Sequence, residues 1–283
     1  MREYVLVKEW FSSEPTISAS NRGFLYGDGF FETLLVKDGE LTYWDLRKQR
    51  ISRTIKFLRT DPIDLDLVES AVQAIWTEER EPWARLRLTF FRQGQGRYLP
   101  EGDEVGVVAQ WFPLDGDPMH SLGSKSVDLG STVLPTSHEG NYKLIAKHWQ
   151  VLAAKEAHER KLDDLILLNS TGEVVESIAG NLFFQFGDSL ITPWLDAGCL
   201  DGVARKVLLD LSHVHEGRLK MDHILHADAA FTVNSVQGLV PLEFGKLRSD
   251  AARFDRERRH LEERRKRKDG VLSSILGPRG NLP

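Results

Sequence analysis

Short β-rich runs joined by tight turns alternate with amphipathic stretches, and this mixture constrains the fold more than any other feature of the chain. The segment FFETLLVKDGELTYW, residues 30–44, predicts two strands around the turn KDGE. Residues 45–59 carry apolar side chains close to helical spacing, and Asp45 is suited to cap that helix. Hairpins interrupted by helices favour an α/β chain with mixed sheets and α+β layering over repeated β-α-β units.

A change in composition near residue 113 divides the chain. The segment PLDGDPMHSLGS is rich in Pro, Gly, Asp and Ser, as linkers are. We therefore expect a smaller N-terminal domain over residues 1–113, a linker over 114–124 and a larger C-terminal domain over 125–283. From about residue 250 the chain carries a highly charged tail, which we interpret as a solvated helix, with a nucleic-acid-binding arm as the alternative.

Length, charge and cysteine content narrow the class of protein. A chain of 283 residues can form two modest domains, and its net charge of −5 provides no basic field for nucleic acid. The single cysteine, Cys199, excludes an internal disulfide framework. The N-terminus has charges inside its apolar run, unlike a signal peptide, and no apolar run approaches the roughly 20 residues of a membrane span. We expect a soluble, cytoplasmic protein without a membrane or nucleic-acid partner.

The segment GNYKLIAKHWQVLAAKEA, residues 140–157, contains three lysines, Lys143, Lys147 and Lys155. If the preceding strand ends near Asn141, Lys143 lies at a strand-to-helix junction and Lys147 one helical turn further on. Lysines on helices usually solvate the outer face. A lysine in a partly desolvated pocket instead becomes a nucleophile. The residues by themselves leave both interpretations open.

Two further patterns suggest a site for a charged ligand. Glu176 follows two valines and precedes an apolar run, so a buried carboxylate there would need a positive or protonated partner, although an edge-strand glutamate is the alternative. In GCLDGVARKVLL, residues 198–209, a glycine turn precedes a helix, which suits a phosphate group. Asn234 and Ser235 open a later turn and could supply donors to the same anion.

Six segments, in this order and spacing, resemble the class IV pyridoxal-phosphate enzymes, which include branched-chain and D-amino-acid aminotransferases and 4-amino-4-deoxychorismate lyase. The resemblance covers about residues 20–243. It implies fold type IV, with two α/β domains and pyridoxal 5'-phosphate between them, a small-molecule amino substrate and no metal ion. It also implies a homodimer, because relatives complete each pocket from the partner subunit. The segments are NRGFLYGDGFFET, RKQRIS, NYKLIAKHWQVLAAKEA, EVVESIAGNLFF, LDGVARKVL and VNSVQGLVPL.

The resemblance also implies a role for individual residues. Lys143 corresponds to the lysine that forms the Schiff base with the cofactor aldehyde and moves the Cα proton. Glu176 corresponds to the carboxylate that keeps the pyridine nitrogen protonated. Lys147 falls where relatives carry tyrosine, leucine or arginine, near the cofactor's phenolic oxygen. The implied phosphate ligands are Arg50, Ser235, Val236 and the backbone N–H groups of Val203 and Ala204.

The shared machinery does not choose the reaction, because every member of the family begins by removing the Cα proton. YGDGFFET, FFRQGQGRYLP and VNSVQGLVPL resemble the lyase more than the aminotransferases. They make Phe31, Arg97 and Tyr98 candidate substrate-binding residues. We therefore predict a 4-amino-4-deoxychorismate lyase that releases pyruvate and p-aminobenzoate. The alternative is an aminotransferase that acts between a branched-chain or D-amino acid and 2-oxoglutarate. A non-catalytic binding protein is disfavoured by the pair Lys143 and Glu176.

Overall fold

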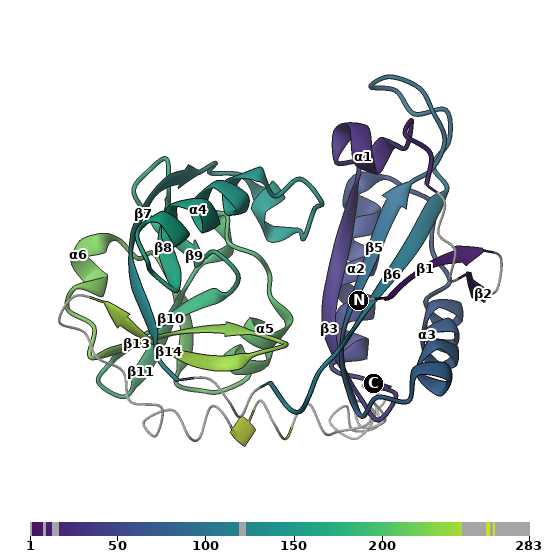
Figure 1. Cartoon of the computed structure of the whole chain (residues 1–283). Helices are drawn as coiled ribbons and strands as arrows, with labels where there is room; N and C mark the ends of the chain where they lie inside the picture. The colour runs from purple at the N-terminus through teal and green to yellow at the C-terminus, as the bar shows by residue number, and fades with distance from the viewer. Residues whose placement is uncertain are drawn as a thin grey trace, which may run out of the picture.

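The computed structural model describes residues 2–7, 10–12, 17–118, 123–244, 259–260 and 263. Two sheets, each with its own helices, form two halves that lie side by side in Figure 1, the first purple to blue and the second teal to green. Most of the charged tail, including its interpretation as a solvated helix or a nucleic-acid arm, lies outside the described residues. None of the helices within the described ranges has the length and apolarity needed to cross a bilayer.

The first half is an antiparallel sheet covered on one face by two helices. The helices α2 (Trp44–Leu58) and α3 (Leu65–Glu79) pack onto it through an apolar core that includes Ile51, Val72 and Trp111. A third helix, α1 (Arg22–Tyr26), precedes β3. The strand order is β2 (Trp10–Ser12), β1 (Arg2–Val7), β6 (Val105–Pro113), β5 (Trp83–Arg92), β3 (Gly29–Lys37), β4 (Glu40–Leu41).

The second half is a mixed sheet, with parallel pairing of β7 to both β14 and β8 and of β11 to β12. Its helices are α4 (His148–Glu159), α5 (Val203–Leu209) and α6 (Met221–Ile224). The strand order is β12 (Val214–Gly217), β11 (Ser189–Pro193), β10 (Asn181–Phe186), β13 (Ala229–Asn234), β14 (Gly238–Phe244), β7 (Lys125–Leu134), β8 (Asp164–Asn169), β9 (Val174–Ser177).

The predicted α/β architecture with mixed sheets is confirmed. The predicted helix cap at Asp45 is wrong. Helix α2 begins at Trp44, two residues earlier than a cap at Asp45 implies, and Asp45 lies in its first turn. The reason is that Tyr43 adopts a left-handed backbone conformation, with φ of 57°, and so becomes the residue that turns the chain from β4 into the helix.

A buried ion triad fastens α2 to the sheet. Glu32 on β3 accepts hydrogen bonds from Arg50 Nε at 2.7 Å and from Arg47 Nη1 at 2.8 Å. Both arginines belong to α2, three positions apart, so they share one helix face. Burial would raise the pKa of Glu32, but the charges of Arg50 and Arg47 outweigh it and lower the pKa to about 2. The carboxylate therefore stays ionised and pairs with both guanidinium groups, which leaves the triad with a net charge of +1.

We predict that Glu32→Gln destabilises the fold by about 3 kcal/mol near neutral pH, because it leaves two buried cations without their counter-ion. A carboxyl whose pKa falls from 4.5 to about 2 on folding contributes stability above pH 4.5, and this contribution is lost as the pH falls towards 2. Urea unfolding at several pH values should therefore show the difference between wild type and variant shrinking from pH 5 to pH 2.

Asp66→Asn is the matched control, because its carboxylate is 89% exposed and pairs with Lys48 of α2 at 3.2 Å. Its effect should stay below about 1 kcal/mol. A Glu32→Gln difference from wild type that does not change with pH would contradict the lowered pKa of Glu32.

Candidate functional site

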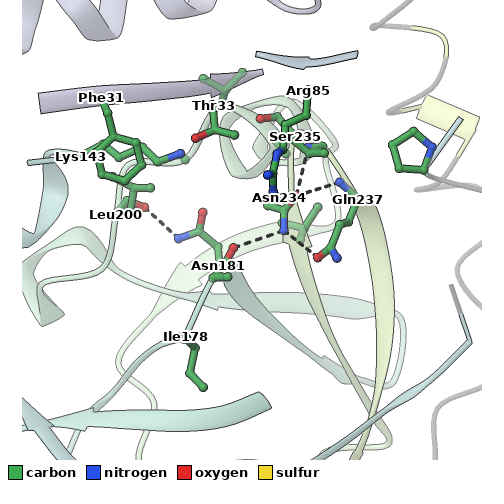
Figure 2. A pocket seen from close by; sticks show the side chains of 18 of the residues that line it. Phe31, Thr33, Arg85, Lys143, Ile178, Asn181, Leu200, Asn234, Ser235 and Gln237 are labelled. Atoms are coloured by element: carbon green, nitrogen blue, oxygen red, sulfur yellow. Dashed lines mark hydrogen bonds between the residues drawn. The ribbon is translucent and has the colours of Figure 1, made fainter. Parts of the chain in front are cut away.

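A cavity of about 770 Å³ lies between the two halves and is lined by residues of both. Figure 2 shows Phe31, Thr33 and Arg85 on the side of the first sheet and Ile178 and Asn181 on the side of the second. Most of the site residues predicted from the sequence line this one cavity. They are Phe31, Arg50, Lys143, Glu176, Val203, Ala204, Ser235 and Val236.

Lys143 is held in the cavity by backbone pairing with the first sheet. The Phe31 N–H donates to the Lys143 carbonyl at 2.9 Å, and the Ile145 N–H donates to the Gly29 carbonyl at 3.0 Å. This antiparallel pairing crosses from the second half of the molecule to the start of β3. It directs the Lys143 side chain over the Phe31 ring, with Nζ 4.8 Å from the ring centroid.

The electrostatic environment of Lys143 favours its neutral form. Burial lowers the pKa of Lys143 to about 7, and the nearby charges of Arg50, Arg47 and Arg87 act in the same direction, while Glu32 opposes them. An amine with a pKa near 7 is substantially deprotonated at neutral pH. Lys143 is therefore suited to attack a carbonyl carbon and to carry a proton.

Glu176 lies at the end of β9 (Val174–Ser177), only 8% exposed. The Leu200 N–H donates to its Oε2 at 2.9 Å, and Gln150 Nε2 donates to its Oε1 at 3.3 Å. Burial raises the pKa of Glu176, and Lys147 is the main opposing influence. A buried carboxylate with few protein donors is stabilised by a protonated ligand group, which a pyridine nitrogen would supply.

The positively charged side chains suited to bind a phosphate group, those of Arg47 and Arg50, come from α2. Arg50 Nη1 donates to the Asp201 carbonyl at 3.2 Å, while Glu32 holds its Nε and Nη2. Arg47 Nη2 donates to the Ser235 hydroxyl oxygen at 2.6 Å, which leaves the hydroxyl proton free to donate to an anion. A guanidinium has five N–H donors, so Arg50 keeps donors for a ligand after these contacts.

Two loops from the second half face the same region. Helix α5 begins at Val203, so the N–H groups of Val203 and Ala204 lie in its first turn, where donors have no intrahelical acceptor. A Cβ atom at Gly202 would meet Asn181 Oδ1 at 2.0 Å, so any other residue here would force the Asn181 side chain to shift. In the other loop, the Val236 N–H already donates to Asn234 Oδ1 at 3.0 Å.

Lys147 lies at a different place in the secondary structure from the one predicted. It was expected one turn into a helix, but it is the N-cap residue of α4, which begins at His148. The pairing of residues 143–145 with β3 delays the start of the helix. Lys147 still lines the cavity, and burial lowers its pKa while Glu176 opposes this. Lys155 is exposed on α4, as predicted for a surface lysine.

Arg97 and Tyr98 are not among the residues that line this chain's cavity. They lie in the loop between β5 and β6. Tyr98 is 91% exposed, and the centroid of its ring lies 6.1 Å from that of Tyr26. The Arg97 carbonyl accepts a hydrogen bond from Arg22 Nη1 at 2.6 Å.

Sequence reasoning missed Glu32, Arg47 and Arg85. The spacing of Arg47 and Arg50 on one helix face was the available signal for a shared carboxylate, but the carboxylate itself comes from a strand 15 residues earlier. Nothing in the local pattern of β5 distinguishes Arg85 from an arginine on a solvated strand face.

The donor set fits the cofactor that the sequence resemblance implies. A lysine with a pKa of about 7, an arginine for a phosphate group and a buried carboxylate for a ring nitrogen face the same cavity. Within the ranges that the structure describes, no group of three or more His, Cys, Asp or Glu side chains could hold a metal ion.

The sequence and the fold of this chain resemble those of known proteins. Residues 29–243 match the model of the family described as amino-transferase class IV. An aminodeoxychorismate lyase from Bacillus subtilis is 25% identical over 240 residues, which is 81% of this chain and 81% of the relative. A putative branched-chain-amino-acid aminotransferase from Methanocaldococcus jannaschii is 25% identical over 260 residues, 86% of this chain and 87% of the relative.

Among solved structures, a putative 4-amino-4-deoxychorismate lyase from Legionella pneumophila has the same fold. Its TM-score is 0.80 at 20% identity, and the match covers 89% of this chain and 96% of that one. Since the family model matches more than half of the chain, this protein belongs to the class IV aminotransferase family.

Proposed function

We propose that this chain is a pyridoxal-phosphate-dependent lyase that converts 4-amino-4-deoxychorismate into pyruvate and p-aminobenzoate. The observation that carries the cofactor assignment is the convergence of Lys143, Glu176 and Arg50 on one cavity. The lyase reaction is supported by the Bacillus subtilis relative, which matches over most of both chains. The loop sequence FFRQGQGRYLP points in the same direction.

The residues of the cavity have separate tasks in this reaction. Arg50, Ser235 and the first turn of α5 bind the phosphate group, and Glu176 keeps the ring nitrogen protonated. The cofactor, when bound, withdraws electrons from the substrate carbon that carries the amine. Lys143, neutral at its lowered pKa, accepts the proton from that carbon and returns a proton to the departing three-carbon fragment.

An aminotransferase is the second candidate function. The Methanocaldococcus jannaschii relative supports it, because it matches a larger share of this chain at the same identity as the lyase. Such an enzyme would use the same Lys143 but return the proton to the cofactor, and would act on a branched-chain or D-amino acid with 2-oxoglutarate.

Borohydride reduction shows which lysine reacts with the cofactor. Reduction of the cofactor-loaded protein with borohydride should attach the cofactor irreversibly to Lys143, as peptide mass mapping would reveal. Lys143→Ala should lose both the visible absorption and the label, because the amine is missing. Lys147→Met and the surface control Lys155→Ala should keep both. A label that persists in Lys143→Ala and disappears in Lys147→Met would assign the reactive amine to Lys147.

The products formed from aminodeoxychorismate distinguish a lyase from an aminotransferase. Offered aminodeoxychorismate without a keto acid, the enzyme should release pyruvate and p-aminobenzoate in equal amounts, as coupled lactate dehydrogenase and fluorescence assays would measure. A panel of L- and D-amino acids with 2-oxoglutarate is the comparison. Turnover that requires both an amino donor and a keto acid, with no pyruvate from aminodeoxychorismate, would reject the lyase in favour of the aminotransferase.

We also propose that the protein is a homodimer. Large apolar side chains are exposed on α1, on the loop between β5 and β6 and on α4, which Figure 1 shows at the upper end of the molecule. Phe24 is 77% exposed, Leu99 83% and Val151 66%, and apolar side chains gathered at one end of a molecule are typical of a protein–protein interface. In such a dimer, Arg97 and Tyr98 would act as substrate residues by reaching the cavity of the partner subunit.

Sedimentation equilibrium tests the dimer. Leu152→Lys, on the exposed face of α4, should weaken self-association by at least tenfold, because it brings a charge into an apolar interface. Leu225→Lys is the control, since Leu225 is 62% exposed but follows α6 on the far side of the second half (Figure 1). A wild-type protein that remains monomeric at micromolar concentration would contradict the proposal.

A further inference from the structure

Two arginines lie on the face of β5 that looks towards the cavity. Along this strand, Ala84, Leu86 and Leu88 are buried in the core of the first half, so Arg85 and Arg87 alternate onto the opposite face. Arg85 lines the cavity, and Figure 2 shows it on the same side as Thr33 and Phe31.

Aromatic rings, rather than carboxylates, hold these arginines. The Arg85 guanidinium lies 4.3 Å from the centroid of the Phe112 ring, and that of Arg87 lies 3.7 Å from the centroid of Phe31. Within the described part of the chain, neither forms an ion pair with a carboxylate. Arg47 and Arg50 differ in this respect, because both are paired with Glu32.

The two unpaired charges also affect each other. Burial lowers the pKa of Arg87, and the charge of Arg85 lowers it further. Two neighbouring guanidinium groups without a counter-ion favour an anion between or beside them, and a carboxylate suits their planar donors. Of the described residues that line the cavity, Glu176 is the one carboxylate. It accepts from the Leu200 N–H and from Gln150 Nε2, and it forms no ion pair with Arg85 or Arg87.

The reactive lysine, Lys143, contacts the same aromatic ring as Arg87. The Phe31 ring is contacted both by Lys143 Nζ, 4.8 Å from its centroid, and by the Arg87 guanidinium, 3.7 Å from its centroid. A substrate whose amine-bearing carbon lies beside Lys143 can therefore extend across Phe31 towards Arg85 and Phe112, which line the same cavity.

We infer that Arg85 is a specificity-determining residue, which binds a substrate carboxylate remote from the reacting amine and so selects acidic amino substrates over neutral ones. The inference rests on the proposed function, in that it places the amine-bearing carbon of the substrate beside Lys143. It extends that function by naming the substrate class, which is an amine with a carboxylate on the far side of the molecule.

The test compares ligands that differ in one carboxylate, bound to the cofactor-loaded enzyme and measured by calorimetry. The pairs are glutarate against butyrate, and p-aminobenzoate against aniline. In the wild type, the member with the additional carboxylate should bind more tightly in both pairs. Arg85→Gln should weaken the binding of that member by about tenfold or more, because it removes a charged hydrogen bond. The affinity for the member without the additional carboxylate should stay unchanged. Arg85→Lys should restore part of the difference.

Lys37→Gln is the matched control. Lys37 also lies over an aromatic ring on the first sheet, 5.2 Å from the centroid of Trp83, but it does not line the cavity. The Lys37→Gln substitution should leave the affinities for both ligand pairs unchanged. Equal weakening of both members by Arg85→Gln, an unchanged preference in that variant, or no preference in the wild type would each overturn the inference.

Failure of the inference about Arg85 and failure of the proposed function give different results. If aminodeoxychorismate is not cleaved but Arg85→Gln still abolishes the preference for glutarate, the lyase proposal fails and the role of Arg85 stands. If the wild type cleaves aminodeoxychorismate and Arg85→Gln keeps its preference in both ligand pairs, the lyase stands and the inference about Arg85 fails.

Discussion

The buried carboxylate of Glu32 is the interaction on which the rest of the site depends. It pairs with Arg47 and Arg50 at a point where neither could be ionised and uncompensated without a large cost. The same two arginines then reach the second half of the molecule, Arg47 through the Ser235 hydroxyl and Arg50 through the Asp201 carbonyl. One acid on β3 therefore fixes the helix to its sheet and also aligns the loops that would hold a phosphate.

Glu32 also affects the pKa of Lys143. It raises the pKa of Lys143, whereas Arg50, Arg47 and Arg87 lower it. A cluster with three arginines and no acid would depress the amine further and repel its protonated form altogether. With Glu32 present, the pKa settles at about 7, where the lysine can both give and accept a proton at neutral pH. The acid thus serves the fold and the chemistry through the same charge.

Local pattern was enough to predict some of these features and not others. The α/β architecture follows from hairpins that alternate with amphipathic helices, because the periods of strands and helices are visible in the sequence. The need of Glu176 for a partner follows from its apolar neighbours. The start of α4 could not be predicted, because residues 143–145 leave the helix to pair with a strand more than 100 residues earlier. The Glu32 triad is hidden for the same reason, since its contacts with Ser235 and Asp201 form only in the folded chain.

The two cavity lysines show how position decides chemistry between identical side chains. Both are desolvated, and burial lowers the pKa of each. Lys143 faces mainly arginines, so its surroundings favour the neutral amine. Lys147 faces Glu176, so its principal charged neighbour favours the cation. A nucleophile must be neutral, whereas a cation beside a buried carboxylate keeps that carboxylate ionised. The backbone pairing that directs Lys143 over Phe31 and leaves Lys147 at the helix N-cap therefore separates the two roles before any ligand binds.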